Sequence, residues 1–474
     1  MTPTCARPPR NRSNVSRAIA VALAAAALPT ALACGGPTRT DRPNATAPAA
    51  ASSSPATGPG EGTAPPGGAA FPQLSGDITK RLDSAIQDVL KETGVPGVIA
   101  GVWANGKGSY VRAFGVSDKQ SNAKMTSDLY MRIGSVTKTF TVTGLLRLVD
   151  QGKVKLDDPV GKYVDGVPDG DKITLRQLAD MRSGLFNYSE DAGFDKTLKE
   201  DPERTFLPAE LLAYAFQHPS NFPPGQRFQY SNTNTVLIGM VIEKVAKQPL
   251  AGYLQRNVIS PARLGRTSFP RNASLPDPHA RGYTTDTTDG QEADATGWNP
   301  SWAWAAGAMV SDLRDMRTWA HTLATGTILS PASQKARLDF QPTGLPGTGY
   351  GLGIFDNHGW IGHNGSLPGY QAVVVYLPEA EATLVLLLNS DTAHQGSEPS
   401  TLFAQAVTKI VSPGHVYTLP AMASTPPTPV PSSSPGTATP SAPSAPSAPS
   451  ASPSVVPPTS GPTVPVVPPT PGTT

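Results

Sequence analysis

The tetrad Ser135-Val136-Thr137-Lys138 sets a hydroxyl and an amine three residues apart. The apolar pattern over 139–149 predicts a helix, and residues three apart on a helix lie on one face. Near the helix start, Ser135 would meet the positive end of the helix dipole, which favours an oxyanion. In a water-poor pocket Lys138 would lose basicity and act as a base. Taken alone, however, the tetrad is better explained by an N-capping serine and a solvated lysine.

A second cluster, Tyr230-Ser231-Asn232, precedes an apolar run over 236–245 that is typical of a helix. A phenol beside a lysine can carry a proton to and from a serine oxygen. The side-chain amide of Asn232 can bind an amide group of a substrate. The alternative is that Ser231 or Asn232 caps the helix and takes no part in chemistry.

The third cluster is His363-Asn364-Gly365, which precedes two strand-like runs at 371–377 and 383–389. A glycine such as Gly365 in an edge strand lets a substrate backbone approach closely. His363 can donate a hydrogen bond to the Tyr230 and Ser135 hydroxyls or to a substrate carboxylate. The alternative is a structural histidine, one of seven in the chain.

The elements that must position these clusters can be read from periodicity. Helical spacing of apolar residues predicts a helix over Asp77–Thr93, and a closing helix follows over Leu402–Val411. Val98–Trp103 and Ser109–Phe114 are strand-like, and the Asn105-Gly106 pair between them favours a hairpin. These elements predict an α/β (α+β) fold. An antiparallel sheet would be flanked by the two terminal helices, with a mostly helical lobe over about 135–319 inserted between its strands.

The two ends of the chain differ from its middle, because more than half of its 51 prolines lie there. Arginines before an apolar run over 18–28, followed by Ala31-Leu32-Ala33-Cys34, predict a secretion signal. The segment also resembles a bacterial lipobox, in which Cys34 would carry the lipid; an ordinary A-x-A cleavage site is the alternative. We therefore predict four parts: a signal peptide at 1–33, a Pro/Gly/Ala-rich linker at 34–70, a catalytic domain at 71–415 and a disordered Pro/Ser/Thr-rich tail at 416–474.

Bulk properties exclude several classes of protein. The formal net charge of +2 gives no basic footprint for nucleic acid. The two cysteines, Cys5 and Cys34, precede the globular part, so a cysteine nucleophile or a disulfide is not expected in it. The sequence shows no HExxH motif or Cys/His cluster, and we expect no metal and no other cofactor. The expected partner is a small-molecule or peptide substrate, and the expected assembly is a monomer.

The three clusters in this order, about ninety and then about 130 residues apart, resemble the penicillin-recognising serine hydrolases of the serine β-lactamase-like superfamily. The resemblance is to the branch of D-alanyl-D-alanine carboxypeptidases and class C β-lactamases, and it spans roughly Ile78–Val411. Further stretches support it: Arg132-Ile133-Gly134, Met181-Arg182-Ser183-Gly184-Leu185, Ala306-Gly307-Ala308 and Tyr350-Gly351-Leu352-Gly353.

The resemblance implies a reaction through an acyl-enzyme. Ser135 would attack the carbonyl carbon, and Lys138 and Tyr230 would take its proton and pass it to the leaving group. Backbone N–H groups of Ser135 and of a residue near Gly369 or Tyr370 would form the oxyanion hole. Water would then cleave the acyl-enzyme.

The resemblance also implies roles in substrate binding. Asn232 would hold the substrate amide, and His363 would stabilise the transferred proton and the Tyr230 oxygen. Asn364, Gly365 and Ser366 would also bind substrate. Trp302 and Phe186 would line the cleft, although packing in the core explains both aromatic residues equally well.

The sequence departs from the carboxypeptidase pattern at two points. Carboxypeptidases of this type often carry an arginine just before the H-x-G strand for a terminal carboxylate, but residues 354–361 contain none. Asn364 replaces the commoner threonine, although Ser366 restores a hydroxyl two residues later. These departures shift the expectation toward an esterase or a peptidase of different terminal specificity.

Three hypotheses follow. The favoured one is an exported D-alanyl-D-alanine carboxypeptidase-like serine peptidase of cell-wall peptides. It would be held at the outer face of the membrane by lipid on Cys34, or secreted if the lipid is absent. The second is an esterase or β-lactamase on the same scaffold. The third, of another class, is a non-catalytic penicillin- or wall-binding module.

Overall fold

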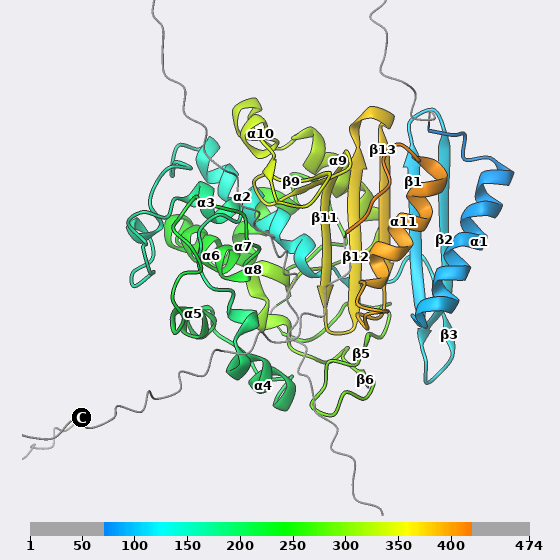
Figure 1. Ribbon diagram of the computed structural model, residues 1–474, viewed down its shortest axis with the longest axis horizontal. Helices are drawn as coiled ribbons and strands as arrows, with labels where there is room; N and C mark the ends of the chain where they lie inside the picture. The colour runs from blue at the N-terminus through cyan, green and yellow to red at the C-terminus, as the bar shows by residue number, and fades with distance from the viewer. Residues whose placement is uncertain (1–70, 271, 420–474) are drawn as a thin grey trace, which may run out of the picture. The chain divides into compact units, whose positions relative to one another are not determined.

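The computed structural model describes residues 71–270 and 272–419. The predicted signal peptide, Cys34, the linker and all but the start of the tail lie outside them. The centre is a nine-stranded sheet in the order β3-β2-β1-β13-β12-β11-β10-β9-β8, with antiparallel neighbours throughout (Figure 1). Its strands are β1 Gly97–Ala104, β2 Gly108–Asp118, β3 Ala123–Lys124, β8 Gln341–Pro342, β9 Thr348–Tyr350, β10 Phe355–Asn357, β11 Trp360–Leu367, β12 Tyr370–Leu377 and β13 Ala382–Leu388.

The first and last strands of the chain, β1 and β13, are neighbours in this sheet. Ala104 pairs with Gly108 across the predicted hairpin, and Gly106 there has φ +66°, which glycine adopts without strain. β1 also pairs with β13, with Val98 opposite Leu388. The antiparallel sheet predicted from the alternating strand-like runs is therefore confirmed.

Two helices cover one face of the sheet, α1 (Gly76–Thr93) and α11 (Pro399–Val411) (Figure 1). Leu82 and Ile86 of α1 and Phe403 of α11 are fully buried there. α1 ends at Gly94, whose φ of +72° gives the left-handed conformation common after a helix. Both terminal helices lie where the sequence predicts them, within one to three residues.

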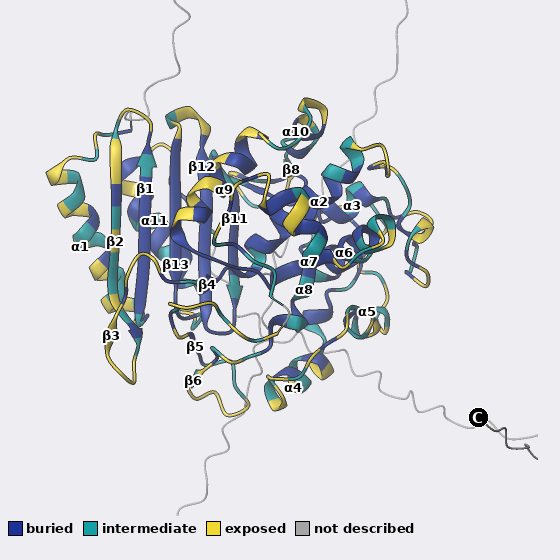
Figure 2. Cartoon of the chain, turned by 180° about the vertical axis from the view of Figure 1, so that it is seen from behind, coloured by how far each residue is buried: buried dark blue, intermediate teal, exposed yellow. Residues whose placement is uncertain are grey.

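The helical lobe packs on the opposite face of the sheet. Its centre is α2, where Phe140 stacks on Trp319 at 3.9 Å between ring centroids. Figure 2 shows the buried central strands and helices in dark blue and the exposed residues on β2 and the outer helices. The remaining helices are α2 Thr137–Asp150, α3 Leu175–Ala179, α4 Ala192–Glu200, α5 Pro208–Phe216, α6 Asn232–Ala246, α7 Leu250–Leu254, α8 Trp304–Gly307, α9 Leu313–Thr325 and α10 Pro331–Arg337.

Short elements complete the fold. Two-stranded pairs form between β4 (Met131–Arg132) and β7 (Val310–Ser311) and between β5 (Tyr283–Thr284) and β6 (Ala293–Asp294). The single-turn helices are η1 Gly134–Val136, η2 Val160–Lys162, η3 Tyr188–Glu190, η4 Gln255–Ile259, η5 Pro300–Trp302 and η6 Pro378–Ala380. Within the described residues, we find no helix long and apolar enough to cross a membrane.

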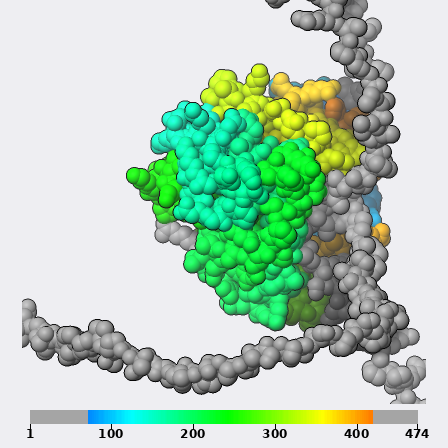
Figure 3. Space-filling view, turned by 60° about the vertical axis from the view of Figure 1, so that its left-hand side comes forward, coloured from blue at the N-terminus to red at the C-terminus, as the bar shows by residue number. Residues whose placement is uncertain are grey.

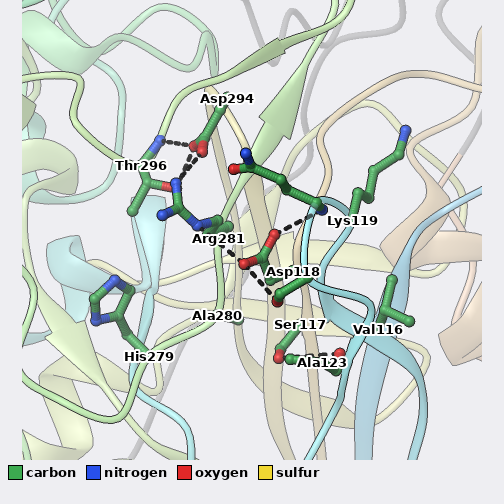
Figure 4. Close-up of polar contacts among 12 residues, drawn as sticks. Val116, Ser117, Asp118, Lys119, Ala123, His279, Ala280, Arg281, Asp294 and Thr296 are labelled. Carbon is green, nitrogen blue, oxygen red and sulfur yellow. Dashed lines mark hydrogen bonds and ion pairs between the residues drawn. The ribbon is translucent and has the colours of Figure 1, made fainter.

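A long loop, residues 273–298, is fastened to the sheet and to the start of the lobe. Arg281 bridges Asp118 of β2 (3.4 Å) and Asp294 of β6 (2.6 Å), as Figure 4 shows. On the other side, the buried Arg132 donates to the carbonyl oxygens of Ala273 (2.6 Å) and Thr296 (3.2 Å). Because Arg132 is three residues before Ser135, this loop helps to fix the backbone that leads into the first predicted cluster.

Candidate active site

Ser135 lies in the single turn η1, directly before α2, where the helical lobe meets the sheet. Its side chain is half-buried, whereas Lys138 is fully buried one turn later. The Lys138 Nζ atom lies 2.9 Å from Ser135 Oγ and 2.8 Å from the carbonyl oxygen of Ala306, a residue of α8. The predicted geometry, with both side chains on one face of the helix start, is present.

Burial changes the chemistry of Lys138. Desolvation lowers the pKa of its amine well below the usual value, since a cation is unfavourable away from water. The structure gives Lys138 no carboxylate partner within the described residues. A neutral amine that touches a serine hydroxyl is a competent proton acceptor.

Tyr230 lies next to this pair, at the end of the segment that leads into α6. Its ring centroid is 4.8 Å from Lys138 Nζ, and burial raises the pKa of its phenol. The hydroxyl makes no well-formed hydrogen bond to a described residue, although it is near enough to Ser135 for that hydroxyl to oppose the rise in pKa. Tyr230 is therefore a neutral phenol with a free donor beside Ser135 and Lys138.

His363 lies on β11 with its ring fully engaged. Burial, together with a smaller contribution from the nearby Lys138, lowers its pKa to about 3, so the imidazole is neutral at ordinary pH. Nδ1 lies 2.5 Å from the carbonyl oxygen of Asn364 and must donate to it, which leaves Nε2 to accept from the Tyr350 hydroxyl at 3.2 Å. The expected hydrogen bond from His363 to Tyr230 is thus absent, because the pleat of β11 turns the ring toward Tyr350 of β9.

The backbone of β11 runs against the nucleophile turn. A Cβ atom on Gly365 would stand 2.1 Å from the Ile133 carbonyl oxygen and 2.9 Å from the Ser135 nitrogen. A Cβ atom on Gly134 would stand 2.7 Å from the backbone nitrogen of Ser366. Only glycine allows this approach at either position, and it sets the backbone of Gly365 and Ser366 against the turn that holds Ser135.

The predicted second oxyanion donor, near Gly369 or Tyr370, is therefore wrong. Gly369 lies in the turn between β11 and β12, and its N–H donates to Asp391 Oδ1 at 2.9 Å. Tyr370 pairs with Leu367 inside the sheet. The residue whose backbone nitrogen lies against the nucleophile turn, at Gly134, is Ser366, which directly follows the H-x-G triplet.

The side chains of Asn364 and Ser366, both predicted to be substrate-binding residues, point away from Ser135. They alternate with His363 and Gly365, so they point to the sheet face that α1 and α11 cover. Asn364 donates to the buried Glu398 at the start of α11 (3.2 Å), and Ser366 Oγ accepts from Gln371 at 3.4 Å.

Asn232 is the first residue of α6 and is half-exposed. Its side-chain nitrogen donates to Ser189 Oγ at 3.0 Å, and its backbone N–H donates to Asn187 Oδ1 at 3.0 Å. Asn187 in turn donates to Glu190 at 3.1 Å. Asn232 therefore does not cap α6 with its side chain, and a chain of three polar residues continues from it.

Of the two predicted cleft aromatics, Trp302 lies in the core and Phe186 does not. Trp302 is 5% exposed, with its ring 6.0 Å from that of Phe194 and its carbonyl oxygen bound by Tyr188. Phe186 is half-exposed and stacks on His218 at 3.9 Å. Packing explains Trp302, whereas Phe186 remains a residue able to meet a substrate.

Several residues of the site had no clear signal in the sequence. Ala306 and Tyr350 belong to stretches that supported the resemblance, but only the structure places them at Lys138 and His363. Asn187, Ser189 and Glu190 follow no spacing pattern, because they join the site through tertiary contacts with α6. Within the described residues, no group of three or more His, Cys, Asp or Glu side chains is arranged to hold a metal ion.

Comparison with known proteins is consistent with this site. Residues 82–407 match the family model described as beta-lactamase. The D-stereospecific amidohydrolase from Streptomyces sp. is 31% identical, with 70% of this chain and 98% of that chain covered and a TM-score of 0.63. The D-amino acid amidase from Ochrobactrum anthropi SV3, solved with L-phenylalanine amide, is 28% identical, with 71% and 97% covered and a TM-score of 0.60.

Among curated proteins, the protein flp of Staphylococcus aureus strain MRSA252 is 25% identical over 339 residues, which are 68% of this chain and 65% of flp. This chain thus spans slightly less than two thirds of the length of that relative. The family model covers well over half of the chain, so the protein belongs to the beta-lactamase family of serine hydrolases.

Proposed function

We propose that this protein is a serine amidohydrolase that cleaves an amide bond next to a D-amino acid carrying a free amino group. The observation that carries the proposal is the 2.9 Å contact of the fully buried Lys138 amine, whose pKa burial lowers well below its usual value, with Ser135 Oγ. The D-specificity rests on likeness to the amidohydrolase and amidase structures named above.

Acylation follows from the protonation states. Ser135 Oγ forms a bond to the substrate carbonyl carbon while its proton passes to neutral Lys138. The resulting oxyanion is held by the backbone N–H groups of Ser135 and Ser366. Tyr230, a neutral phenol beside Lys138, donates its proton to the leaving nitrogen and is reprotonated from Lys138 as the C–N bond breaks.

Deacylation uses the same groups in reverse. Water attacks the acyl-enzyme carbonyl carbon, and its proton passes through Tyr230 and Lys138 to Ser135 Oγ as the ester bond breaks. His363 holds no positive charge in this cycle, because its pKa of about 3 keeps it neutral. Its ring, 6.1 Å from that of Tyr230, holds the phenol in place instead.

The polar chain beyond Asn232 supports recognition of a free amine. Glu190 is half-exposed, and among the described residues it makes no ion pair; its only polar contact is with Asn187. Burial raises the pKa of its carboxyl, a cost that an approaching ammonium group would offset. No arginine precedes β11 for a terminal carboxylate, so an amine-bearing substrate fits the charges better than a peptide with a free C-terminus.

A substrate panel tests this proposal. Purified protein would be offered D- and L-phenylalanine amide, N-acetyl-D-phenylalanine amide, a peptide ending in D-Ala-D-Ala, a chromogenic cephalosporin and a nitrophenyl ester. We expect the unblocked D-amide to have the highest kcat/KM. Preference for the D-Ala-D-Ala peptide would replace the amidase by a carboxypeptidase, and turnover of the ester or cephalosporin alone would replace it by an esterase or β-lactamase.

Glu190→Gln sharpens the panel. We expect KM for the unblocked D-amide to rise by roughly tenfold with kcat little changed, because one charged hydrogen bond is lost. The N-acetyl substrate, which has no ammonium group, should not respond. Glu203→Gln, an exposed glutamate in the same lobe, serves as the matched control. An equal loss on both substrates would show that Glu190 acts on the fold and not on the amine.

We also propose that the protein is exported and held at the outer face of the membrane by lipid on Cys34. The arginine-rich start, the apolar run over 18–28 and Cys34 after Ala33 support this. Growth of producing cells with an alkyne-tagged fatty acid should label the wild-type protein and leave Cys34→Ser unlabelled. Secretion of unlabelled wild-type protein into the medium would show an ordinary cleavage site.

A further inference from the structure

A surface cavity of about 570 Å³ lies behind the catalytic residues, between α3, the loop 225–228 and the segment from α10 to β8. Figure 3 shows the teal segment that contains α3 beside the yellow-green segment that contains α10 on this side of the lobe. The volume is within the range of pockets that hold small molecules and far above that of one water. The proposed reaction does not involve this cavity.

The cavity wall contains two buried polar atoms that have no partner among the described residues. Asp180 is 8% exposed, and its Oδ1 accepts no hydrogen bond. Nε of Arg182, two residues later, is buried and donates none, although its Nη2 donates to the Pro342 carbonyl oxygen at 2.7 Å. Buried groups of this kind are normally paired, so an acceptor and a donor orphaned in one cavity point to an absent ligand.

The charged side chains that line the cavity do not form ion pairs with one another. Arg176, Arg182 and Arg227 all line it. The first two are near enough to lower the pKa of Asp180, yet neither forms an ion pair with it. Arg227 is exposed and lies over the Phe222 ring at 4.3 Å, and it forms no ion pair with a carboxylate of the described residues. The cavity therefore offers cations for an anion and one buried carboxylate for a donor.

We infer that this cavity is a second binding site, for a small zwitterion that carries a carboxylate next to an ammonium group, as a free amino acid does. The carboxylate would be held by Arg182 and Arg227, and the ammonium group by Asp180. A simple anion would leave Asp180 unpaired, and a simple cation would leave the arginines unpaired. The inference does not depend on the reaction proposed above.

The site is one side-chain layer from the catalytic residues. Phe228 lines the cavity and lies 5.3 Å, ring to ring, from Tyr350, whose hydroxyl meets His363. Met181, between the two orphaned residues, belongs to the same buried cluster as Tyr230. A ligand here would be separated from the catalytic site by Phe228 and Met181 and would not occupy it.

Calorimetric titration of the full protein with D-alanine, propionate, ethylamine and inorganic phosphate tests the inference. Propionate lacks the ammonium group of alanine, and ethylamine lacks its carboxylate. We expect saturable binding of alanine. We expect each single-charge analogue to bind at least roughly tenfold more weakly than alanine does. Absence of saturable alanine binding would mean that the cavity holds only water, and propionate or inorganic phosphate binding as tightly would mean a plain anion site; either result overturns the inference.

Variants locate the bound molecule. Asp180→Asn, Arg182→Gln and Arg227→Gln should each weaken alanine binding by roughly tenfold while hydrolysis continues. Ser135→Ala and the exposed control Arg263→Gln should bind as the wild type does. Arg227 is exposed, so its substitution tests the site even if a buried variant fails to fold. Unchanged binding in Arg227→Gln and Asp180→Asn, or loss of binding in Ser135→Ala, would place alanine elsewhere and overturn the inference.

Discussion

The polar side chains that lie against the two faces of β11 differ in how fully they are hydrogen-bonded. On the face toward Ser135, the Tyr230 hydroxyl makes no well-formed hydrogen bond to a described residue, and burial lowers the pKa of Lys138 well below its usual value. On the face toward α11, Asn364 is bonded to Glu398, and Gln371 donates to Ser366 and accepts from the backbone N–H of Ser400 at 2.9 Å. One strand thus separates a polar cluster with unused hydrogen-bonding groups from a closed cluster, in which nearly all hydrogen bonds are made.

This contrast separates chemistry from support. A group with an unused donor or a shifted pKa can exchange protons with a substrate, whereas a group whose bonds are filled can only hold its neighbours in place. The motif His363-Asn364-Gly365 is therefore not a single functional unit. His363 and Gly365 face the reaction, and Asn364 anchors the strand to the terminal helix.

The largest effect is expected at the nucleophile. Ser135→Ala should lower turnover of every substrate in the panel by about a thousandfold or more, because no other group forms the acyl-enzyme. Initial rates with the D-amide measure this. Ser366→Ala, whose hydroxyl is on the far face, is the matched control and should keep most activity. Turnover of Ser135→Ala near that of the wild type would refute the assignment of the nucleophile.

The second effect, at Lys138, combines loss of activity with preserved stability. Lys138→Met should lower kcat/KM by roughly a hundred- to ten-thousandfold, since the proton acceptor is lost. The lowered pKa means that the unfolded chain binds the proton more tightly than the folded one, so wild-type stability rises as pH rises toward 10.5. Lys138→Met should lack this rise.

Thermal unfolding at neutral and alkaline pH measures the second part, with the exposed Lys335→Met as control. A lower melting temperature for Lys138→Met at neutral pH would show that the lysine is charged and paired in the folded protein. That outcome would remove the contrast between the two faces of β11.

Asp180 extends the comparison to a third polar site. Its pKa is raised from 3.8 to about 6 by burial, with Arg182 and Arg176 opposing the rise. The folded state therefore binds the proton more tightly, and stability is lost as pH rises through about 6. Asp180→Asn should gain up to about 3 kcal/mol in free energy of unfolding at pH 8 and nothing at pH 4.

Urea unfolding at the two pH values measures this difference, with the exposed Asp165→Asn as control. A loss of stability in Asp180→Asn at pH 8 would mean that the carboxylate is paired in the folded protein. In that case Asp180 belongs with the closed clusters.

The smallest effect is expected on the closed face. Asn364→Ala removes the partner of the buried Glu398 and should cost about 2 kcal/mol of stability, while kcat/KM of the folded enzyme stays within about tenfold of the wild type. Adding Glu398→Gln should recover part of that cost, because the buried charge is removed. A double-mutant cycle by urea unfolding measures the coupling. Loss of activity without loss of stability would move Asn364 into the catalytic group.

The sequence predicted most of the frame. The strand-like runs at both ends, Asn105-Gly106 and the amphipathic spacing of α1 depend on local rules, so their positions were right within one to four residues. It failed at Gly369 and at the side chains of Asn364 and Ser366. Those errors concern which side of a strand faces which layer, and that depends on the register of β11 against β12.

By itself, the sequence determined the family, the fold and the cluster of Ser135, Lys138 and Tyr230, because their spacing follows from helix geometry and from the order of the motifs. Only the tertiary structure decided how His363 is protonated, that Ser366 supplies the backbone beside Ser135, and that Asn187 and Glu190 extend the site beyond Asn232. These depend on burial and on contacts between segments far apart in the chain, and no local pattern encodes either of them.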